Sequence, residues 1–196
     1  MAISLAKNQT ISLEKTAGGG LQQVRMGLGW DPVKAKGFLG RLLGGNGEVD
    51  LDASCIVLDG EKKPLEMVWF RQLESGDGFI RHSGDNRTGE GAGDDETIQV
   101  DLQHLPAAAT YLVFTVNSFT GQSFESVANA YCRLIDQPSG NELARFDLAE
   151  KGGHTGVIMA YLSRSGGSWD FTAVGTATNG RTVEDLIGAA AQAVRG

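Results

Sequence analysis

Cysteine is scarce in this sequence: only Cys55 and Cys132 occur among 196 residues, and each lies inside an apolar segment. Two isolated cysteines provide neither a disulfide framework nor the spacing of a zinc site, so we expect both to be buried, reduced thiols. No apolar run approaches the ~20 residues of a membrane-spanning helix. The N-terminus alternates apolar and polar residues and lacks the apolar core of a signal peptide. These absences predict a cytoplasmic protein.

Positive charge is also in short supply. The chain has 17 Lys and Arg residues against 24 Asp and Glu residues, which gives a net charge of −7. Because nucleic-acid binding needs a basic surface, this balance argues against DNA or RNA as a partner. Proline is rare, at four residues, whereas 28 glycines are scattered between short apolar runs. This pattern is typical of a fold with many turns, and the length predicts a single domain over residues 1–196.

Short segments with period-two alternation recur along the chain and predict β-strands. We expect strands over residues 3–14, 21–30, 48–59, 66–71, 97–102, 111–118, 130–136, 142–148, 155–163 and 168–175. Residues 123–129 favour a short helix, and residues 181–194 predict a C-terminal helix with Thr182 as its N-cap. The predicted fold class is mainly β: an antiparallel β-sandwich with a short helix near 123–129 and a C-terminal helix.

The most unusual stretch runs from His82 to Glu96. It holds five carboxylates, one Asn, one Thr and four glycines against a single arginine. Such a run repels itself unless a cation lies among the carboxylates, and oxygen ligands on a glycine-rich backbone suit a hard cation. A solvated acidic loop is the alternative interpretation. Asp31 and the pair Asp50 and Asp52 place further acids at strand ends, and two like charges on one face of a strand are unfavourable without a counter-ion.

Familiar loop types do not account for this stretch. Residues 85–96 have the length of an EF-hand loop, but Arg87, Gly89 and Glu90 occupy positions that require two ligands and a glycine. A phosphate-binding glycine loop is excluded because no lysine follows and the flanking acids repel phosphate. Because loops converge at each pole of a sandwich, we expect one site assembled from separate loops. Oxygen ligands select Ca²⁺ or Mg²⁺, and this many oxygens favour Ca²⁺, with room for two ions.

Residues 33–47 form a basic and apolar insert that interrupts the strand pattern. One interpretation is a mobile loop with a short helical turn. The other is a contact with a membrane surface or a partner protein, made through Phe38, Leu39, Leu42 and Leu43.

Catalytic signatures are missing. His82, His104 and His154 show no ligand spacing and are expected to be surface or hydrogen-bonded histidines. No GxSxG nucleophile motif occurs. The sequence therefore favours a protein without enzymatic activity.

Seven short motifs, taken together and in their order along the chain, are informative about the family. They are GLGWD (27–31), DLDAS (50–54), HSGDNRTGEGAGDDE (82–96), VNSFTGQSF (116–124), CRLID (132–136), ELARFDL (142–148) and WDFTAVG (169–175). In this set and its order the sequence resembles the TerD family of bacterial tellurite-resistance and stress proteins. The resemblance covers nearly the whole chain. Through WDPVKAKG (30–37) and GRTVEDL (180–186) it is most similar to the TerZ branch.

The resemblance implies a C2-like β-sandwich that binds Ca²⁺ through acidic loops at one end. Carried onto this sequence, the implied metal ligands are Asp31, Asp50, Asp52, Asp85, Asn86, Thr88, Glu90, Asp94, Asp95 and Glu96. Ala92 stands where the family usually has Asp, which removes one possible oxygen ligand.

The family also implies a function. It is that of a stress-response protein associated with tellurite resistance, in cytoplasmic complexes near the membrane protein TerC. The implied partners are other Ter-type proteins and TerC. We expect a calcium-binding protein that acts as a calcium-dependent scaffold or sensor in such a complex, and the composition of residues 33–47 adds peripheral membrane contact as an expectation. The alternative is a metal-dependent protein that binds, or acts on, nucleotides or phosphorylated small molecules.

Overall fold

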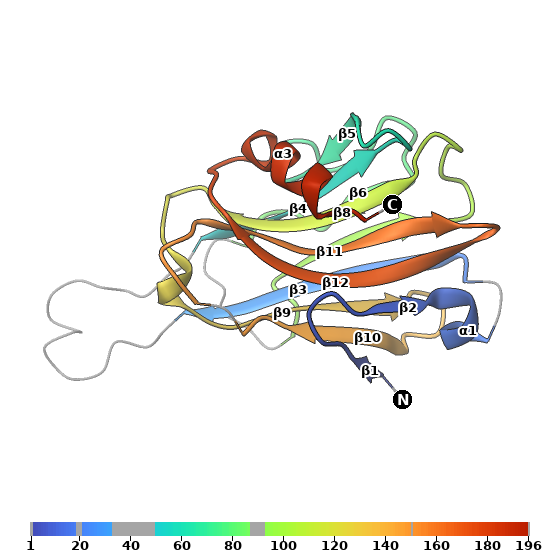
Figure 1. Cartoon of the computed structure of the whole chain (residues 1–196), viewed down its shortest axis with the longest axis horizontal. Coiled ribbons are helices and arrows are strands. Elements are labelled where there is room, and N and C mark those ends of the chain that lie inside the picture. The colour runs from blue at the N-terminus through green and yellow to red at the C-terminus, as the bar shows by residue number, and fades with distance from the viewer. Residues whose placement is uncertain (1, 19–20, 33–49, 87–92, 150, 196) are drawn as a thin grey trace, which may run out of the picture.

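The computed structural model describes residues 2–18, 21–32, 50–86, 93–149 and 151–195, which form two packed β-sheets (Figure 1). The first sheet has the order β1 (Ile3–Ser4), β10 (Glu142–Asp147), β9 (Val127–Asp136), β3 (Gln23–Pro32), β7 (Glu96–Asp101) and β6 (Ile80–His82). The second has the order β2 (Thr10–Ser12), β12 (Ser168–Thr178), β11 (Gly156–Ser165), β8 (Tyr111–Ser118), β4 (Leu51–Leu58) and β5 (Pro64–Val68). Neighbouring strands are antiparallel except β1 and β10, which are parallel. The predicted β-sandwich is confirmed.

Two hydrophobic clusters hold the layers together. The larger lies between the sheets and includes Met26 of β3 and Phe114 of β8. β4 is buried along its whole length, because Cys55 contributes to this core while Ile56 contributes to a second cluster beneath α3 (Val183–Ala193). Helix α3 thus covers the outer face of the second sheet (Figure 1). That residues 1–196 form a single domain stays a prediction.

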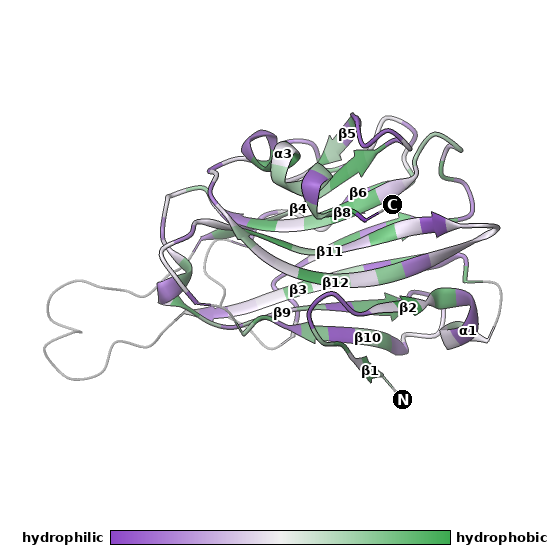
Figure 2. Cartoon of the chain, in the orientation of Figure 1, coloured by the Kyte–Doolittle hydropathy of each residue, from purple (hydrophilic) through white to green (hydrophobic). Residues whose placement is uncertain are grey.

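The C-terminal helix begins where its capping residues predict. Thr182 is the N-cap, and its N–H donates to the Asp185 carboxylate at 3.1 Å. Leu186 and Ala190 on one face are buried, and Figure 2 shows both hydrophobic and hydrophilic residues on the turns of the helix. Among the described residues, no helix is both long enough and apolar enough to cross a membrane.

Three local predictions differ from the structure. The expected helix over 123–129 is a single 3-10 turn, η1 (Phe124–Ser126), because the residues from Val127 onward pair with β3. The expected extended segment 3–14 becomes helical at α1 (Leu13–Ala17), which ends at Gly18 with a φ of 74°. The short strand β6 was not expected from the sequence, since it is only three residues long.

Both cysteines are buried free thiols, as predicted. Burial raises the pKa of the Cys132 thiol to about 12 and also raises the pKa of Cys55. Neither side chain therefore supplies a thiolate nucleophile or ligand near neutral pH.

The strand directions bring the predicted acids to one end of the sandwich. β3 ends at Asp31 and Pro32, β7 begins at Glu96, and Glu96 is paired with Leu28 of β3. The β4 strand starts at the same end, drawn on the left in Figure 1. Residues 33–49 and 87–92 lie outside the described residues, and with them the 33–47 insert and the predicted ligands Thr88 and Glu90.

Candidate metal centre

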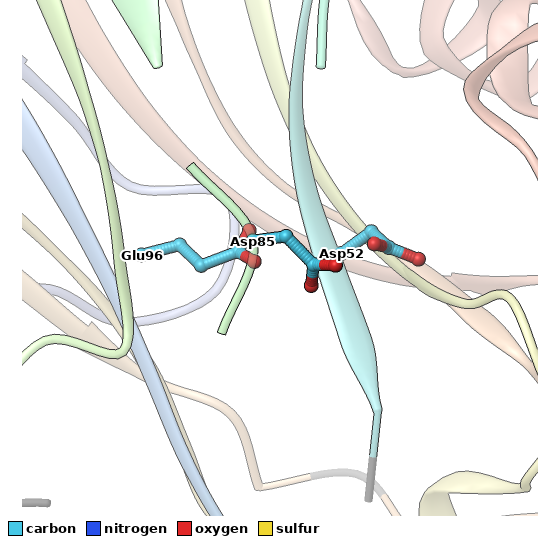
Figure 3. A group of neighbouring side chains, drawn as sticks. All are labelled: Asp52, Asp85 and Glu96. Carbon is cyan, nitrogen blue, oxygen red and sulfur yellow. The ribbon is translucent and has the colours of Figure 1, made fainter. Parts of the chain in front are cut away.

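Three of the predicted ligands converge at this end of the molecule. Asp52 from β4, Asp85 from the segment after β6, and Glu96 at the start of β7 each contribute one carboxylate oxygen, and these oxygens lie within 4.8 Å of one another. Figure 3 shows Asp85 between the other two side chains. Asp52 and Glu96 are buried, whereas Asp85 is exposed. We call these three residues the acidic centre; it is open to solvent on the side of Asp85.

The side chains of Glu96 and His82 form hydrogen bonds with the backbone of β4 where no described strand pairs with it. Strand β5 pairs with β4 only from Cys55 to Leu58, so the first half of β4 has no strand neighbour on that side among the described residues. There the Ala53 N–H donates to Glu96 Oε2 at 2.7 Å, and the Ala53 carbonyl lies 3.1 Å from His82 Nε2. Two side chains of the first sheet therefore satisfy the open edge of the second.

The hydrogen bonds around His82 define where its proton is. The Gly84 N–H donates to Nδ1 at 3.0 Å, so that nitrogen carries a lone pair and the ring proton is on Nε2. Nε2–H then faces both the Ala53 carbonyl and Glu96 Oε2, the latter at 3.2 Å. Both ring nitrogens are engaged, which leaves carboxylate oxygens as the available ligands of the acidic centre.

Asp52 is in an electrostatically unfavourable position. It is only 3% exposed, and its Oδ2 has no hydrogen-bond partner in the part of the chain that the structure describes. Burial first, and then the charges of Glu96, Asp50 and Asp85, raise the pKa of Asp52 to about 8, while the Phe119 N–H opposes the shift. Among the described residues, no Lys or Arg forms an ion pair with any member of the acidic centre. A group of carboxylates with an unpartnered buried oxygen and no counter-charge fits a bound cation.

A second group of predicted ligands lies beside the first. Asp95 accepts the Trp30 N–H at 2.8 Å and the Asn86 side-chain amide at 3.2 Å. Burial raises the pKa of Asp95, and the charge of Asp31 adds to the shift. Asp31 itself is exposed and accepts a hydrogen bond from Asn129 at 2.8 Å. The backbone N–H of Asn86 donates to Glu96 Oε1 at 2.9 Å, which links the two groups.

Asp94 differs from its neighbours because it has its own counter-ion. Its carboxylate accepts hydrogen bonds from Arg133 Nε at 2.7 Å and Nη2 at 3.0 Å, and from the Tyr131 hydroxyl at 3.2 Å. The bond to Asp94 in turn raises the pKa of Arg133. This bidentate pair neutralises Asp94, so the structure separates it from the acidic centre. We call Asp94, Tyr131 and Arg133 the anchor.

The anchor explains two glycines of the GLGWD motif. A Cβ on Gly27 would lie 2.2 Å from the Asp94 carboxylate, and a Cβ on Gly29 would lie 2.4 Å from the Tyr131 ring. Both side chains therefore lie flat on β3, over positions that only glycine leaves free. The anchor fixes the residues that lead directly into Asp95 and Glu96.

Sequence reasoning did not identify two of these contributors. His82 was expected to be surface or hydrogen-bonded, without a link to the acids, although it opens the same motif as Glu96. Arg133 lies in a strand whose alternating pattern predicts that its side chain points away from the core. The pattern does not predict which acid it pairs with.

Comparison with known proteins agrees with the motifs. The family model of the TerD domain matches residues 1–189. The tellurium resistance protein TerZ of Serratia marcescens is 56% identical over 184 residues, which is 94% of this chain and 94% of TerZ. The stress response protein SCP2 of Bacillus subtilis (strain 168) is 42% identical over 196 residues, covering 95% of this chain and 98% of SCP2.

Solved structures share the fold. The crystal structure of a homologue of telluride resistance protein (TerD) from Streptomyces coelicolor A3(2) has a TM-score of 0.68 at 22% identity, covering 86% of this chain and 96% of that chain. The crystal structure of a protein of unknown function also has a TM-score of 0.68, at 24% identity, covering 86% of this chain and 98% of that one. With a family match that spans almost all of its length, this chain belongs to the TerD family.

Proposed function

We propose that this chain is a calcium-binding stress-response protein associated with tellurite resistance, and that the acidic centre holds a Ca²⁺ ion. One observation carries the proposal. Among the described residues, Asp52 Oδ2 is buried without a hydrogen-bond partner, and a carboxylate oxygen of Asp52 lies within 4.8 Å of oxygens of Asp85 and Glu96. A divalent cation supplies the missing counter-charge and the missing partner at once.

The donor set favours Ca²⁺ over other metals. Its available atoms are carboxylate oxygens, because His82 uses both ring nitrogens in other contacts and both cysteines are buried thiols with raised pKa values. Oxygen-only ligands select against Zn²⁺ and Cu²⁺. Mg²⁺ requires near-ideal octahedral geometry, whereas Ca²⁺ accepts the irregular arrangement that separate loops provide.

A second Ca²⁺ near Asp31 and Asp95 is part of the proposal. Asp95 is raised in pKa by burial and by neighbouring acids, and Asn86 lies between the two groups. Asp50 lies close enough for its charge to affect Asp52. Asp94 would stay with Arg133 and hold the segment in place.

Calcium would act here as a structural switch. Neutralising the acidic centre would hold Asp85 and Glu96 of the first sheet's end against Asp52 of β4, and so connect the two sheets at this end. A protein with such a switch suits the role of a calcium-dependent scaffold or sensor, in a cytoplasmic complex of Ter-type proteins near the membrane, with TerC as one partner. The names of TerZ and SCP2 support the association with tellurium resistance and stress response.

Thermal unfolding of metal-stripped protein tests the proposal. A ligand that binds only the folded state at about 100 times its Kd stabilises it by about 2.7 kcal/mol, or about 5–10 °C in a chain of this size. We expect this shift with Ca²⁺ and a smaller one with Mg²⁺. Asp170→Asn, which removes a carboxylate on β12 away from the acidic centre, should keep the full shift. No shift with millimolar Ca²⁺ would refute calcium binding.

Calorimetry distinguishes the proposed function from the alternative, a metal-dependent binder of nucleotides or phosphorylated small molecules. Titration with cyclic and linear nucleotides, with and without Ca²⁺, should give no saturable heat if the protein is a scaffold or sensor. Saturable heat that depends on Ca²⁺ would instead favour a metal-dependent nucleotide or phosphorylated small-molecule binder.

A further inference from the structure

A cavity of about 450 Å³ lies at the end of the sandwich opposite to the acidic centre. Its lining comes from α1, from the residues just before β3 and just after β7, and from the end of β11, the start of β12 and the turn between them. Since the acidic centre lies at the end of β3 and the start of β7, these segments are at the far pole. Figure 1 shows α1 and the β11–β12 turn together on the right. The volume is in the range of small-molecule sites.

The inner wall of the cavity is apolar. Leu13, Leu102 and Trp169 line it, and all three belong to the core between the sheets, with exposures of 1%, 4% and 5%. Leu21, partly buried, packs against the same core. An apolar group that enters the cavity would therefore contact the edge of the hydrophobic core.

The polar side of the cavity is dominated by Arg164. Its Nε donates to the Ala109 carbonyl at 3.0 Å, and its Nη2 donates to the carbonyls of Leu105 and Pro106 at 3.1 and 3.0 Å. The guanidinium also lies over the Trp169 ring, 4.6 Å from its centroid. Four contacts hold this side chain in one orientation, so little conformational entropy remains to be lost when it binds a ligand.

The charge of Arg164 has no carboxylate partner. Within the described ranges no ion pair involves this residue, and its Nη1 makes no hydrogen bond. An arginine stays protonated at neutral pH even when it is partly buried. Glu14 is the acid on the cavity lining, and it is exposed. The side chains of Ser168 and Gln103, which also line the cavity, make no hydrogen bonds to the described residues and are available to a ligand.

We propose that this cavity binds a small organic monocarboxylate with a flat apolar body, its carboxylate on Arg164 Nη1 and its body against Trp169, Leu13 and Leu102. A monoanion suits the site better than a phosphate dianion, because one nitrogen of one guanidinium is available and Glu14 adds negative charge at the rim. The site is independent of the acidic centre and of any bound metal.

A pair of matched probes tests the proposal by NMR titration of the full chain. 2-Naphthoate should cause saturable shifts of the Trp169 indole N–H and of the Gly167 and Ser168 amides. The neutral isostere 2-naphthamide should bind about tenfold more weakly, since it lacks the charge-assisted hydrogen bond. Arg164→Met should reduce naphthoate affinity to the level of naphthamide.

A filling variant keeps the test valid if Arg164→Met does not fold. A Cβ on Gly167 meets nothing within 4 Å and the backbone there is not left-handed, so Gly167→Phe should fold normally and occupy the cavity. Naphthoate binding should disappear in Gly167→Phe and persist in Ser165→Phe, a control at the end of β11 that is outside the lining. The proposal is overturned if naphthoate causes no saturable shifts, if naphthamide binds equally well, or if Gly167→Phe still binds.

Discussion

Asp52 and Asp94 are both buried acids at the same end of the molecule, yet their surroundings are opposite. The Asp94 side chain is 6% exposed and accepts two hydrogen bonds from Arg133 and one from Tyr131. Asp52 faces the charges of Glu96, Asp50 and Asp85, and one of its oxygens has no hydrogen-bond partner among the described residues. The described part of the chain thus supplies a counter-charge for Asp94 and none for Asp52. This contrast separates a structural carboxylate from one that is placed for a cation.

The largest expected effect comes from removing the counter-ion of Asp94. Arg133→Met leaves a buried carboxylate unpaired and should lower the free energy of unfolding by about 3 kcal/mol. Arg145→Met is the matched control, because Arg145 pairs with the exposed Asp147 at 2.9 Å and lies over the Tyr131 ring. It should cost about 1 kcal/mol or less. Equal losses in urea denaturation would show that Asp94 does not depend on its partner.

The next largest effect on stability should come from filling the space that Gly27 leaves beneath the Asp94 carboxylate. Gly27→Ala places a Cβ 2.2 Å from the Asp94 carboxylate, so the anchor must move, at a cost of about 2 kcal/mol. Gly188→Ala on α3 is the control, since its Cβ meets nothing within 4 Å; it should stabilise the protein by about 0.5–1 kcal/mol. Thermal melts of both variants measure the difference. A neutral Gly27→Ala would mean that Asp94 is not held against β3.

Neutralising Asp52 and neutralising Asp94 should change the stability of the protein in opposite directions. Folding requires the Asp52 carboxyl to take up a proton at neutral pH, because its pKa is raised to about 8; Asp52→Asn removes this cost and should stabilise the metal-free protein by about 1 kcal/mol, or about 2–4 °C. Asp94→Asn removes a charge-assisted pair and should destabilise it by a similar amount. The Asp52 variant should also lose the calcium-dependent rise in melting temperature. If metal-free Asp52→Asn is less stable than the parent, the carboxylate is structural after all.

The smallest effect is a pH dependence. The pKa of Asp52 is about 8 in the folded protein and lower when unfolded, so the stability that its protonated form contributes is lost as the pH rises from about 4 to about 8. Calcium must displace this proton. Affinity for Ca²⁺ should therefore rise about tenfold per pH unit up to about 8 and then level off, as measured by calorimetry. A constant affinity between about pH 6 and about 8 would contradict the assignment.

Much of the fold followed from sequence periodicity, because strands buried on one or both faces carry a strong pattern. The strand over residues 111–118 matches β8 at both ends, and the helix with Thr182 as N-cap is confirmed. The strand β6 was missed because three residues are too few to show an alternating pattern of apolar and polar side chains. The turn at α1 was missed because Leu13 continues the alternation of the preceding strand.

The residues of the candidate site could be predicted from the sequence, but the separate role of each carboxylate could not. Asp94, Asp95 and Glu96 are adjacent acids, and sequence alone treats them alike. Their roles depend on contacts far along the chain: Arg133 for Asp94, Trp30 for Asp95, and Ala53 for Glu96. No local pattern encodes which of three neighbouring carboxylates meets an arginine across a sheet.

The most direct test is a crystal of the protein soaked in calcium chloride. We predict an ion with oxygens of Asp52, Asp85 and Glu96 at about 2.3–2.6 Å, the distances typical of Ca²⁺ coordination, and no ion on the carboxylate of Asp94. Ordered water or no density among these three side chains at saturating calcium would contradict the account.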